Sequence, residues 1–505
     1  MTVPGLNIDP DAATPVYRQI AEGIRAALDE GRLVPGQQLP PTRDLARQLG
    51  VNRNTVIAAY DLLVESGAAT GHTGRGTFLA EARAHDRAGR RPDQPWFGAF
   101  AQAVEGPGVA SLVTVYRVAT SHEGISLAGG YPAGELMPVD EFARAMKRTL
   151  AERGAEALSY GPTAGYAPLR EAIARDMRRQ GADCTASSIL VTNGSQQAIE
   201  LAMRTLVDRG DPVLVEEPTY TGVNSVLSAL GARPVGVPVD EEGLRPDLLA
   251  LAMERHRPRV LYVQPTFHNP TTRTMGEARR REILEIASRF RCLVVEDDWA
   301  GDLSFDGSHR ETLHALDGGR HVLYLSTFSK KLLPGLRLGW VAAPEPVFDR
   351  LVALKQIEDC GSSPLVQAAL HVFIESGGQA EHLDRVRAAY RSRAEAMDAA
   401  LRRHFPDEAR WTPATGGLFT WVVLPEAIDG DELFGAAKER GVLVGRGSLF
   451  HVSGSGRNTL RLTFSSATED QIERGIRIVG ELLRERGAKS RARERSRDLE
   501  AVPFL

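Results

Sequence analysis

The sequence predicts a multidomain protein that joins a small helical domain, closed by a β-hairpin, to a large α/β domain. A chain of 505 residues exceeds what one hydrophobic core supports, so two or three domains are expected. Residues 14–80 carry apolar residues at helical spacing and end in a glycine-rich hairpin pattern. Residues 125–486 instead alternate short β-branched runs with helical patterns, which is typical of a mostly parallel sheet covered on both faces.

Composition argues against several classes of protein. Hydrophobic residues make up 42% of the chain and charged residues 25%, which is ordinary for a soluble globular protein. No charged segment followed by an apolar run opens the chain, and no run of 18 apolar residues occurs. We therefore expect no signal peptide, no membrane-spanning helix and a cytoplasmic location. The three cysteines, Cys184, Cys292 and Cys360, are too widely separated in the sequence for a disulfide framework or a zinc site. We therefore expect no metal.

The small domain begins with an amphipathic helix, whose apolar residues recur every four positions at Val16, Ile20, Ile24 and Leu28. A second helix is expected over residues 42–49, after a loop bracketed by prolines. Asn52 can cap a third helix over residues 53–66, and residues 68–80 are expected to form two strands around a glycine-rich turn. Two helices joined by a tight turn and followed by a hairpin indicate a winged helix-turn-helix.

The small domain is not rich in basic residues, so the positions of its arginines matter more than their number. Residues 1–80 hold seven arginines and no lysine against eight acidic residues. Arg43 opens the second helix, Arg53 opens the third, and Arg75 lies at the hairpin tip. A recognition helix contacts base edges through its first residues, while its partner helix and wing contact phosphates. The alternative is three solvated arginines on an ordinary helical surface.

A resemblance to a known family covers this whole domain. The segments GQQLPPTRDLARQL, VNRNTVIAAY and GRGTF resemble the corresponding segments of GntR-family DNA-binding domains. The resemblance implies that the protein binds double-stranded DNA at a promoter or operator. It also implies six DNA-contacting residues: Arg43, Arg53, Asn54, Thr55, Gly74 and Arg75.

The remaining boundaries follow from composition. Residues 81–119 are charged and proline-containing, and we interpret them as a linker. Residues 120–486 form the large domain. Residues 487–505 are a charged tail with little apolar surface to bury, and we expect them to be frayed or disordered.

Reactive side chains follow several predicted strands of the large domain, where ligands bind in parallel sheets. They are Tyr220, Asn269, Asp297, Asp298 and Lys330. A lysine near buried acids can simply form a salt bridge. The whole set favours a Schiff-base lysine that serves pyridoxal 5'-phosphate, because that cofactor needs an amine, a carboxylate for its ring nitrogen, partners for its phenolic oxygen and an aromatic ring.

An anion site for the cofactor phosphate is also present in the sequence. The segment TNGSQQAIE is a loop entering a helix, so Ser195, Gln196 and the first backbone N–H groups can bind phosphate. Thr327, Ser329 and Arg337 surround the lysine and can add donors to the same dianion.

Residues 125–484 resemble fold-type I pyridoxal-phosphate enzymes of the class I and II aminotransferase group. Eight motifs occur in the family's order, among them SYGPTAGYAPLR, PTFHNPT and STFSKKLLPGLRLGW. The resemblance assigns the Schiff base to Lys330 rather than Lys331, because the family lysine directly follows a serine. It also implies a set of ligand contacts: Asp297 to the ring nitrogen, Asn269 to the phenolic oxygen, Tyr220 stacked on the ring, Tyr160 to the phosphate of the other subunit, and Arg461 to a substrate α-carboxylate facing Gly130.

One position departs from the family. Trp299 occupies the place where a tyrosine usually donates its hydroxyl to the phenolic oxygen. An indole is a donor of different reach, so Asn269 is expected to be the main partner of that oxygen. Cofactor binding itself does not depend on this residue.

The two halves together resemble MocR-type regulators. This resemblance implies a transcription factor that binds pyridoxal 5'-phosphate, senses a small amine, an amino acid or the cofactor itself, and forms a domain-swapped homodimer. A working aminotransferase with a fused DNA-binding domain is the alternative, because PTFHNPT and Arg461 keep the pattern of active enzymes. A third interpretation makes the large domain a dimerisation scaffold without a ligand.

Overall fold

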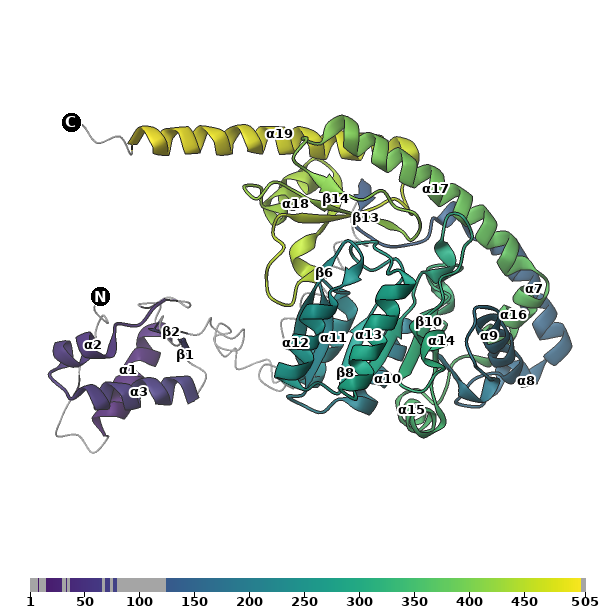
Figure 1. The fold of residues 1–505 in the computed structure, drawn as a ribbon, viewed down its shortest axis with the longest axis horizontal. Helices are drawn as coiled ribbons and strands as arrows, with labels where there is room; N and C mark the ends of the chain where they lie inside the picture. Colours follow the sequence, from purple (N-terminus) through teal and green to yellow (C-terminus); the bar gives the residue numbers. More distant parts are fainter. Residues whose placement is uncertain are drawn as a thin grey trace, which may run out of the picture. The chain divides into compact units, whose positions relative to one another are not determined.

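The computed structural model describes residues 8, 15–29, 33, 37–65, 69–72, 76–79 and 124–500. The chain divides into two compact units, Met1–Ala101 and Gln102–Leu505. Each unit is described by itself below, and Figure 1 colours both along the sequence. The predicted linker, residues 81–119, lies outside the described residues.

The N-terminal unit contains the three predicted helices and the hairpin. They are α1 (Val16–Asp29), α2 (Thr42–Leu49), α3 (Arg53–Glu65), β1 (Ala69–His72) and β2 (Gly76–Leu79). The predicted cap at Asn52 is confirmed, since its Oδ1 accepts a hydrogen bond of 2.9 Å from the backbone N–H of Asn54. One face of α3 is buried in the domain core, as Val56, Tyr60 and Leu63 are at most 4% exposed.

The turn and the hairpin have the geometry of a winged helix-turn-helix. Gly50 ends α2 with φ of 65°, a left-handed conformation that favours glycine and turns the chain toward α3. Strands β1 and β2 pair antiparallel, from Ala69 opposite Leu79 to His72 opposite Gly76. Tyr60 ties α3 to the loop before α2, because its hydroxyl donates to the carbonyl of Pro40 at 2.7 Å. The predicted fold of this domain is confirmed.

The large unit is built on an eight-stranded sheet of order β4-β11-β10-β9-β8-β5-β6-β7. Strands β10, β9, β8, β5 and β6 run parallel, whereas β11 and β7 pair antiparallel. The strand bounds are β4 (Ile189–Thr192), β5 (Pro212–Glu217), β6 (Arg233–Asp240), β7 (Gly243–Leu244), β8 (Val260–Val263), β9 (Leu293–Asp297), β10 (Val322–Thr327) and β11 (Gly339–Ala342).

Helices cover both faces of this sheet, as the sequence predicts. Neighbouring residues of one strand pack into different cores: Val213 and Val215 of β5 join one cluster, and Leu214 joins another. Helices α10 (Ser195–Leu206), α11 (Thr221–Leu230) and α15 (Glu345–Glu358) contribute to the first cluster, and α12 (Pro246–His256) and α13 (Glu277–Arg289) to the second. The remaining helices of this part are α7 (Val139–Arg153), α8 (Ala155–Leu158), α9 (Ala167–Arg179), α14 (Leu313–Asp317) and α16 (Pro364–Glu375).

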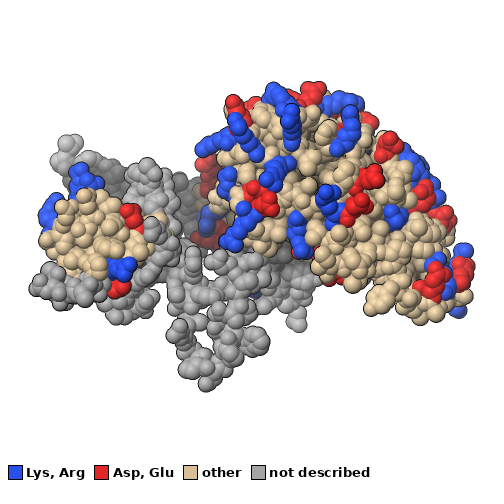
Figure 2. Space-filling view, turned by 90° about the horizontal axis from the view of Figure 1, so that it is seen from below, with Lys and Arg blue, Asp and Glu red and all other residues tan. Residues whose placement is uncertain are grey.

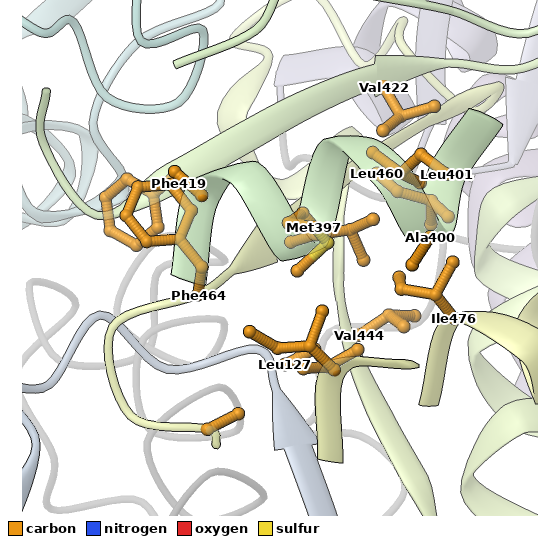
Figure 3. Packing of buried hydrophobic residues seen from close by; sticks show 14 of the residues in the cluster. Leu127, Met397, Ala400, Leu401, Phe419, Val422, Val444, Leu460, Phe464 and Ile476 are labelled. Atoms are coloured by element: carbon orange, nitrogen blue, oxygen red, sulfur yellow. The ribbon is translucent and has the colours of Figure 1, made fainter. Parts of the chain in front are cut away.

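A second, five-stranded sheet of order β12-β13-β15-β14-β3 completes the unit. Its long helix α17 carries Met397, Ala400 and Leu401 onto the sheet, where they pack with side chains of β13, β14 and β15 (Figure 3). The elements are β3 (Ile125–Leu127), α17 (Gly378–His404), β12 (Arg410–Trp411), β13 (Phe419–Val423), α18 (Gly430–Glu439), β14 (Val442–Arg446), β15 (Thr459–Thr463) and α19 (Glu469–Glu500).

Helix α19 corrects one expectation. The chain beyond Arg486 was expected to be frayed, but its backbone is helical as far as Glu500. Residues 484–500 are rich in arginine, glutamate, lysine and alanine, all strong helix formers. High helix propensity therefore accounts for a helical backbone in a segment with few apolar residues.

Candidate functional site

Polar side chains from several segments line one pocket beyond the carboxyl ends of the parallel strands. The pocket has a volume of about 350 Å³ and is bordered by residues that follow β5, β8 and β10, by the end of β9, and by the second sheet. Loops after parallel strands meet at this edge, which is where ligands bind in such sheets. The structure brings seven predicted site residues together here: Gly130, Ser195, Tyr220, Asn269, Asp297, Lys330 and Arg461.

Lys330 lies three residues beyond β10 and lines the pocket. Its Nζ donates a hydrogen bond of 2.8 Å to the carbonyl of Gly130 and lies 5.6 Å from the centre of the Tyr131 ring. Burial, followed by the positive charges of Arg461 and Arg337, lowers the pKa of this amine to about 8. A larger share of Lys330 is therefore neutral and nucleophilic near neutral pH than is usual for lysine.

Lys331 lies in a different environment. Its ammonium group forms an ion pair with Asp302 and lies 5.4 and 4.8 Å from the ring centres of Phe328 and Trp340. The side chain is 5% exposed. The salt-bridge interpretation of a lysine near buried acids thus describes Lys331, whereas Lys330 is the lysine that faces the pocket.

Asp297 ends β9, and only one of its carboxylate oxygens is held. Tyr262 Oη and Gln264 Nε2 donate to Oδ2 at 2.6 and 2.8 Å. Oδ1 is buried and has no hydrogen-bond partner among the described residues. Burial raises the pKa of this carboxyl to about 6, although the two hydrogen bonds oppose the rise. A buried acceptor with one unsatisfied oxygen fits the protonated ring nitrogen of pyridoxal phosphate.

The loop before α10 has the features of a phosphate cradle. Gly194 has φ of 85°, and a Cβ added there would lie 2.9 Å from Nη2 of Arg337. Arg337 also donates to Ser329 Oγ at 3.5 Å and to the carbonyl of Asn193 at 3.4 Å. Backbone N–H groups in the first turn of a helix, beside a guanidinium, attract a phosphate dianion.

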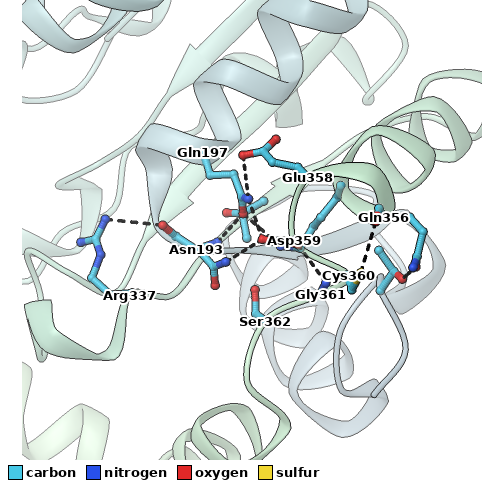
Figure 4. A network of polar contacts seen from close by, with 12 residues as sticks. Asn193, Gln197, Arg337, Gln356, Glu358, Asp359, Cys360, Gly361 and Ser362 are labelled. Carbon is cyan, nitrogen blue, oxygen red and sulfur yellow. Dashed lines mark hydrogen bonds and ion pairs between the residues drawn. The ribbon is translucent and has the colours of Figure 1, made fainter. Parts of the chain in front are cut away.

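A carboxylate behind this loop holds it in place (Figure 4). Asp359 Oδ2 accepts hydrogen bonds from Asn193 Nδ2 at 2.6 Å, from Gln197 Nε2 at 2.7 Å and from Lys355 Nζ at 2.7 Å. Gly361 donates its backbone N–H to Oδ1 at 2.8 Å. Asp359 follows α15 and lies far from the loop in sequence, so it ties two distant segments together. The cradle is therefore preformed by the protein's own contacts.

The same loop is also closely approached by backbone. A Cβ at Gly339, the first residue of β11, would lie 2.8 Å from the carbonyl carbon of Gly194 and 2.9 Å from the backbone nitrogen of Ser195. It would also lie 2.8 Å from the carbonyl oxygen of Ser326. Only glycine fits between β10 and the start of α10.

Arg461, on β15, is buried between two aromatic rings. Its Cζ lies 4.1 Å from the centre of the Phe419 ring and 4.7 Å from that of Phe450. Nη1 donates to Asn269 Oδ1 and Nη2 to the carbonyl of Ala128, both at 2.8 Å. Among the described residues Nε has no partner, and burial lowers the pKa of the guanidinium to about 10. An arginine held by neutral oxygens in this way is suited to a ligand carboxylate.

Trp299 and Tyr220 add aromatic surface to the pocket. Trp299 is 5% exposed, its ring centre lies 5.5 Å from that of Phe419, and within the described part of the chain its Nε1 has no partner. Tyr220 donates its hydroxyl to Gln196 Oε1 at 3.2 Å, and burial raises its pKa to about 12. The tyrosine therefore stays neutral and offers a ring for stacking.

Five predicted cofactor residues are not among those that line this pocket in the single chain: Gln196, Thr327, Ser329, Arg337 and Tyr160. The phosphate contact of Thr327 stays a prediction; here its hydroxyl donates to the carbonyl of Leu338 at 3.2 Å and accepts from the N–H of Ser329 at 3.1 Å. These local bonds stabilise the turn after β10, because a threonine hydroxyl readily bonds nearby backbone. Tyr160 is 93% exposed and does not line this pocket.

The DNA-contact candidates lie at the starts of α2 and α3. Arg43, Arg53 and Asn54 are exposed, and Thr55 is half-buried. Arg53 Nε donates to Thr42 Oγ1 at 3.3 Å, which places the first residues of the two helices side by side. The other two candidates, Gly74 and Arg75, lie outside the described residues.

Several functional neighbours were missed by the sequence analysis. Tyr262 and Gln264 could have been found, because Tyr262 lies in β8 and Gln264 directly follows it, and β8 is the strand next to β9, which ends in Asp297. Phe419, Phe450 and Asp359 gave no such signal, since their contacts depend on how distant elements pack.

The described residues contain neither a metal-binding cluster nor a helix suited to crossing a membrane. Within the described ranges, no three His, Cys, Asp or Glu side chains are grouped to hold a metal ion. No described helix has the length and apolar character that crossing a membrane requires. On the face of the large unit seen in Figure 2, basic and acidic side chains are interspersed.

Comparisons with known proteins agree with this site. Residues 123–479 match the family model described as aminotransferase class I and II, and residues 16–79 match that of bacterial regulatory proteins of the gntR family. The uncharacterized HTH-type transcriptional regulator YdfD of Bacillus subtilis is 31% identical over 93% of this chain and 97% of its own. The "Probable rhizopine catabolism regulatory protein MocR" of Rhizobium meliloti is 33% identical over 86% of this chain and 87% of its own.

Solved structures resemble the large unit. The crystal structure of LysN, an alpha-aminoadipate aminotransferase of Thermus thermophilus complexed with N-(5'-phosphopyridoxyl)-L-leucine, is 36% identical. It covers 78% of this chain and 100% of its own, with a TM-score of 0.73.

Proposed function

The chain belongs to the aminotransferase class I and II family and carries a GntR-family DNA-binding domain, and we propose that it is a transcriptional regulator that binds pyridoxal 5'-phosphate. One observation carries this proposal. A helix-turn-helix with exposed arginines shares a chain with a pocket that contains an amine, an unsatisfied carboxylate oxygen, a stacking ring and an anion cradle. The similarity to named regulators over nearly the whole chain supports it.

The pocket residues have distinct roles in this proposal. Lys330 is the covalent anchor, Asp297 Oδ1 accepts from the ring nitrogen, and Tyr220 stacks on the ring. The 193–195 loop and Arg337 hold the phosphate. When bound, the cofactor supplies an electrophilic carbon to which a primary amine can be attached.

The signal is a small amine or amino acid. Arg461 lies in the same pocket as Lys330 and is held by neutral oxygens, so it can bind the carboxylate of an amino acid whose amine reaches the cofactor. We further propose a domain-swapped homodimer, in which Tyr160 contacts the phosphate of the other subunit. Its exposure in the single chain supports that assignment.

The experiment combines two readouts on the purified full-length protein. Visible absorbance reports the cofactor, and fluorescence anisotropy with the DNA upstream of its own gene reports binding. An amino acid that shifts the absorbance and changes DNA affinity at the same concentration supports the proposal. Specific DNA binding that is indifferent both to cofactor removal and to every amino acid would contradict it and favour a scaffold.

A second function has a specific observation in its favour. Lys330, Asp297 and Arg461 all lie in one pocket, and the pKa of Lys330 is lowered as a working nucleophile requires. The chain is also 36% identical to the alpha-aminoadipate aminotransferase LysN. Steady turnover of an amino acid with 2-oxoglutarate would show a working aminotransferase. A single half-reaction without turnover would favour the regulator.

A further inference from the structure

A second arginine, Arg446, lies in the wall of the same pocket as Lys330 and Arg461. It is the last residue of β14, and it is half-buried. Its Cζ lies 5.2 Å from the centre of the Phe434 ring. Its backbone pairs with β15, but within the described part of the chain its guanidinium forms no hydrogen bond and no ion pair.

That lack of a partner is unusual for an arginine partly removed from water. A guanidinium stays charged at any physiological pH, and charged side chains are seldom buried without a partner. Even two exposed arginines next to β14 and β15 have acidic partners: Arg440 pairs with Glu485 at 2.8 Å and Arg457 pairs with Asp429 at 2.6 Å. Arg446 therefore has the properties of a group whose anionic partner is a ligand.

The other charges of the pocket already have counterparts in the proposed complex. Arg337 faces the cofactor phosphate, and Asp297 faces the ring nitrogen. Arg461 takes the α-carboxylate of the amino acid. Arg446 alone among these four is left over, and one more negative charge on the ligand would pair with it.

We infer that the effector is an acidic amino acid, whose side-chain carboxylate binds Arg446 while its α-carboxylate binds Arg461. The inference rests on the proposed function, because it names the class of amino acid that the same pocket senses. Apolar side chains also line this pocket, namely Phe434, Val444 and Leu449, and they fit the methylene groups of such a ligand. A planar guanidinium matches a carboxylate through two parallel hydrogen bonds, which makes the preference for an acid over an amide strong.

The test titrates the cofactor-loaded, full-length protein with four amino acids and follows visible absorbance. The acidic probes are L-glutamate and L-2-aminoadipate, and their neutral counterparts are L-glutamine and L-norleucine. We expect the better acidic probe to bind about 10- to 100-fold more tightly than its neutral counterpart, the range expected for hydrogen bonds to a charged partner. Two acidic probes of different length are used because the pocket decides which one spans both arginines.

Variants assign the preference to one residue. Arg446→Gln should lose the preference for acids, keep the cofactor and bind the neutral probes as the wild type does. Arg446→Lys should keep part of the preference, because it keeps the charge without the paired donors. Arg440→Gln is the matched control outside the pocket and should behave as the wild type.

Each contrary result has a separate meaning. A wild type that binds the neutral probes as tightly as the acidic ones overturns the inference and leaves amino-acid sensing intact. A preference for acids that survives in Arg446→Gln also overturns it. A wild type that responds to none of the four probes overturns both the inference and the proposed amino-acid sensing.

Discussion

The two units of this protein differ in how their functional basic side chains are exposed and in how many partners hold them. In the N-terminal unit, Arg43 and Arg53 are exposed at the starts of α2 and α3, and Arg53 contacts only a threonine hydroxyl among the described residues. In the large unit, Arg461 is buried between two rings and held by two oxygens, and Lys330 donates to a backbone carbonyl. Phosphates of DNA are neutralised at the surface with release of counterions, so no preformed network is needed. A small ligand removed from water needs its partners in place beforehand.

This contrast predicts how the two units respond to substitution. Changes in the pocket should remove a function outright, because each group there is unique and desolvated. Substitution of an exposed arginine should lower the affinity for DNA by a moderate amount, because many contacts contribute to the binding free energy. The predictions below test this difference, from the largest expected effect to the smallest.

The largest expected effect comes from substituting the adjacent lysines Lys330 and Lys331 one at a time. Lys330→Ala should abolish the covalent attachment of the cofactor, whereas Lys331→Ala should retain it. Borohydride reduction followed by peptide mapping identifies the labelled lysine. Lys331→Ala should instead lower the free energy of unfolding by about 3–5 kcal/mol, because it leaves Asp302 buried without its partner. A cofactor label on Lys331 would show that the assignment is wrong.

Arg461→Ala should separate sensing from cofactor retention. Removing one partner of a desolvated charge pair costs about 2–5 kcal/mol, so effector affinity should fall roughly 30- to several-thousand-fold. The variant should keep the visible absorbance of the bound cofactor and should bind DNA in the absence of effector. Its fold should persist, because no acid among the described residues forms an ion pair with this arginine. Effector titration and thermal melting of the same sample measure both properties. A stable variant with unchanged effector response would rule out the carboxylate role.

The carboxyl of Asp297 should be visible in the pH dependence of the apoprotein's stability. Its pKa is raised from an ordinary value near 3.8 to about 6, so its contribution is present below about pH 4 and is lost as pH rises through about 6. Asp297→Asn lacks this loss and should gain up to about 3 kcal/mol relative to wild type between pH 4 and 7. Urea unfolding of both apoproteins across this range measures the difference. If the free energies of unfolding of the two apoproteins change in parallel with pH, the pKa of the carboxyl is not raised.

The exposed arginines should give the smallest effects. Arg53→Ala should weaken specific DNA binding by about 1–3 kcal/mol if it reads a base edge. Arg43→Ala should weaken specific and random duplexes alike and reduce the salt dependence of binding, as loss of a phosphate contact does. Anisotropy titrations at several salt concentrations distinguish the two. Equal losses on both duplexes for Arg53→Ala would contradict base reading.

Much of the fold could be predicted from the sequence, because capping residues, helix-ending residues and apolar patterns each favour the element that the structure contains. Asn52 caps α3 through its side-chain oxygen, Gly50 ends α2 because glycine readily adopts a left-handed conformation, and the β-branched runs form neighbouring parallel strands. The helical tail was missed because low apolar content was taken to mean disorder. Arginine and glutamate instead favour a helix through backbone propensity without any burial.

The site could be predicted in its members but less well in their contacts. Strand ends located Asp297, Asn269 and Lys330, because the topology of a parallel sheet brings its carboxyl ends together. The local bonds of Thr327 could not be predicted from the sequence, since its hydroxyl donates to the backbone carbonyl of Leu338, which lies beyond the following turn. The aromatic rings around Arg461 come from β13 and from the turn after β14, and no sequence spacing reveals that they meet.

The tight fit at Gly339 limits how this sensor could be redesigned. A library aimed at a new effector can vary the pocket wall around Phe434, which side chains line. At Gly339 any added atom collides with backbone of the cradle, so variants there would be discarded whatever their specificity. Gly339, which packs behind the cradle, therefore tolerates no larger residue, and selection for new ligands should return it unchanged while the residues around Arg446 vary.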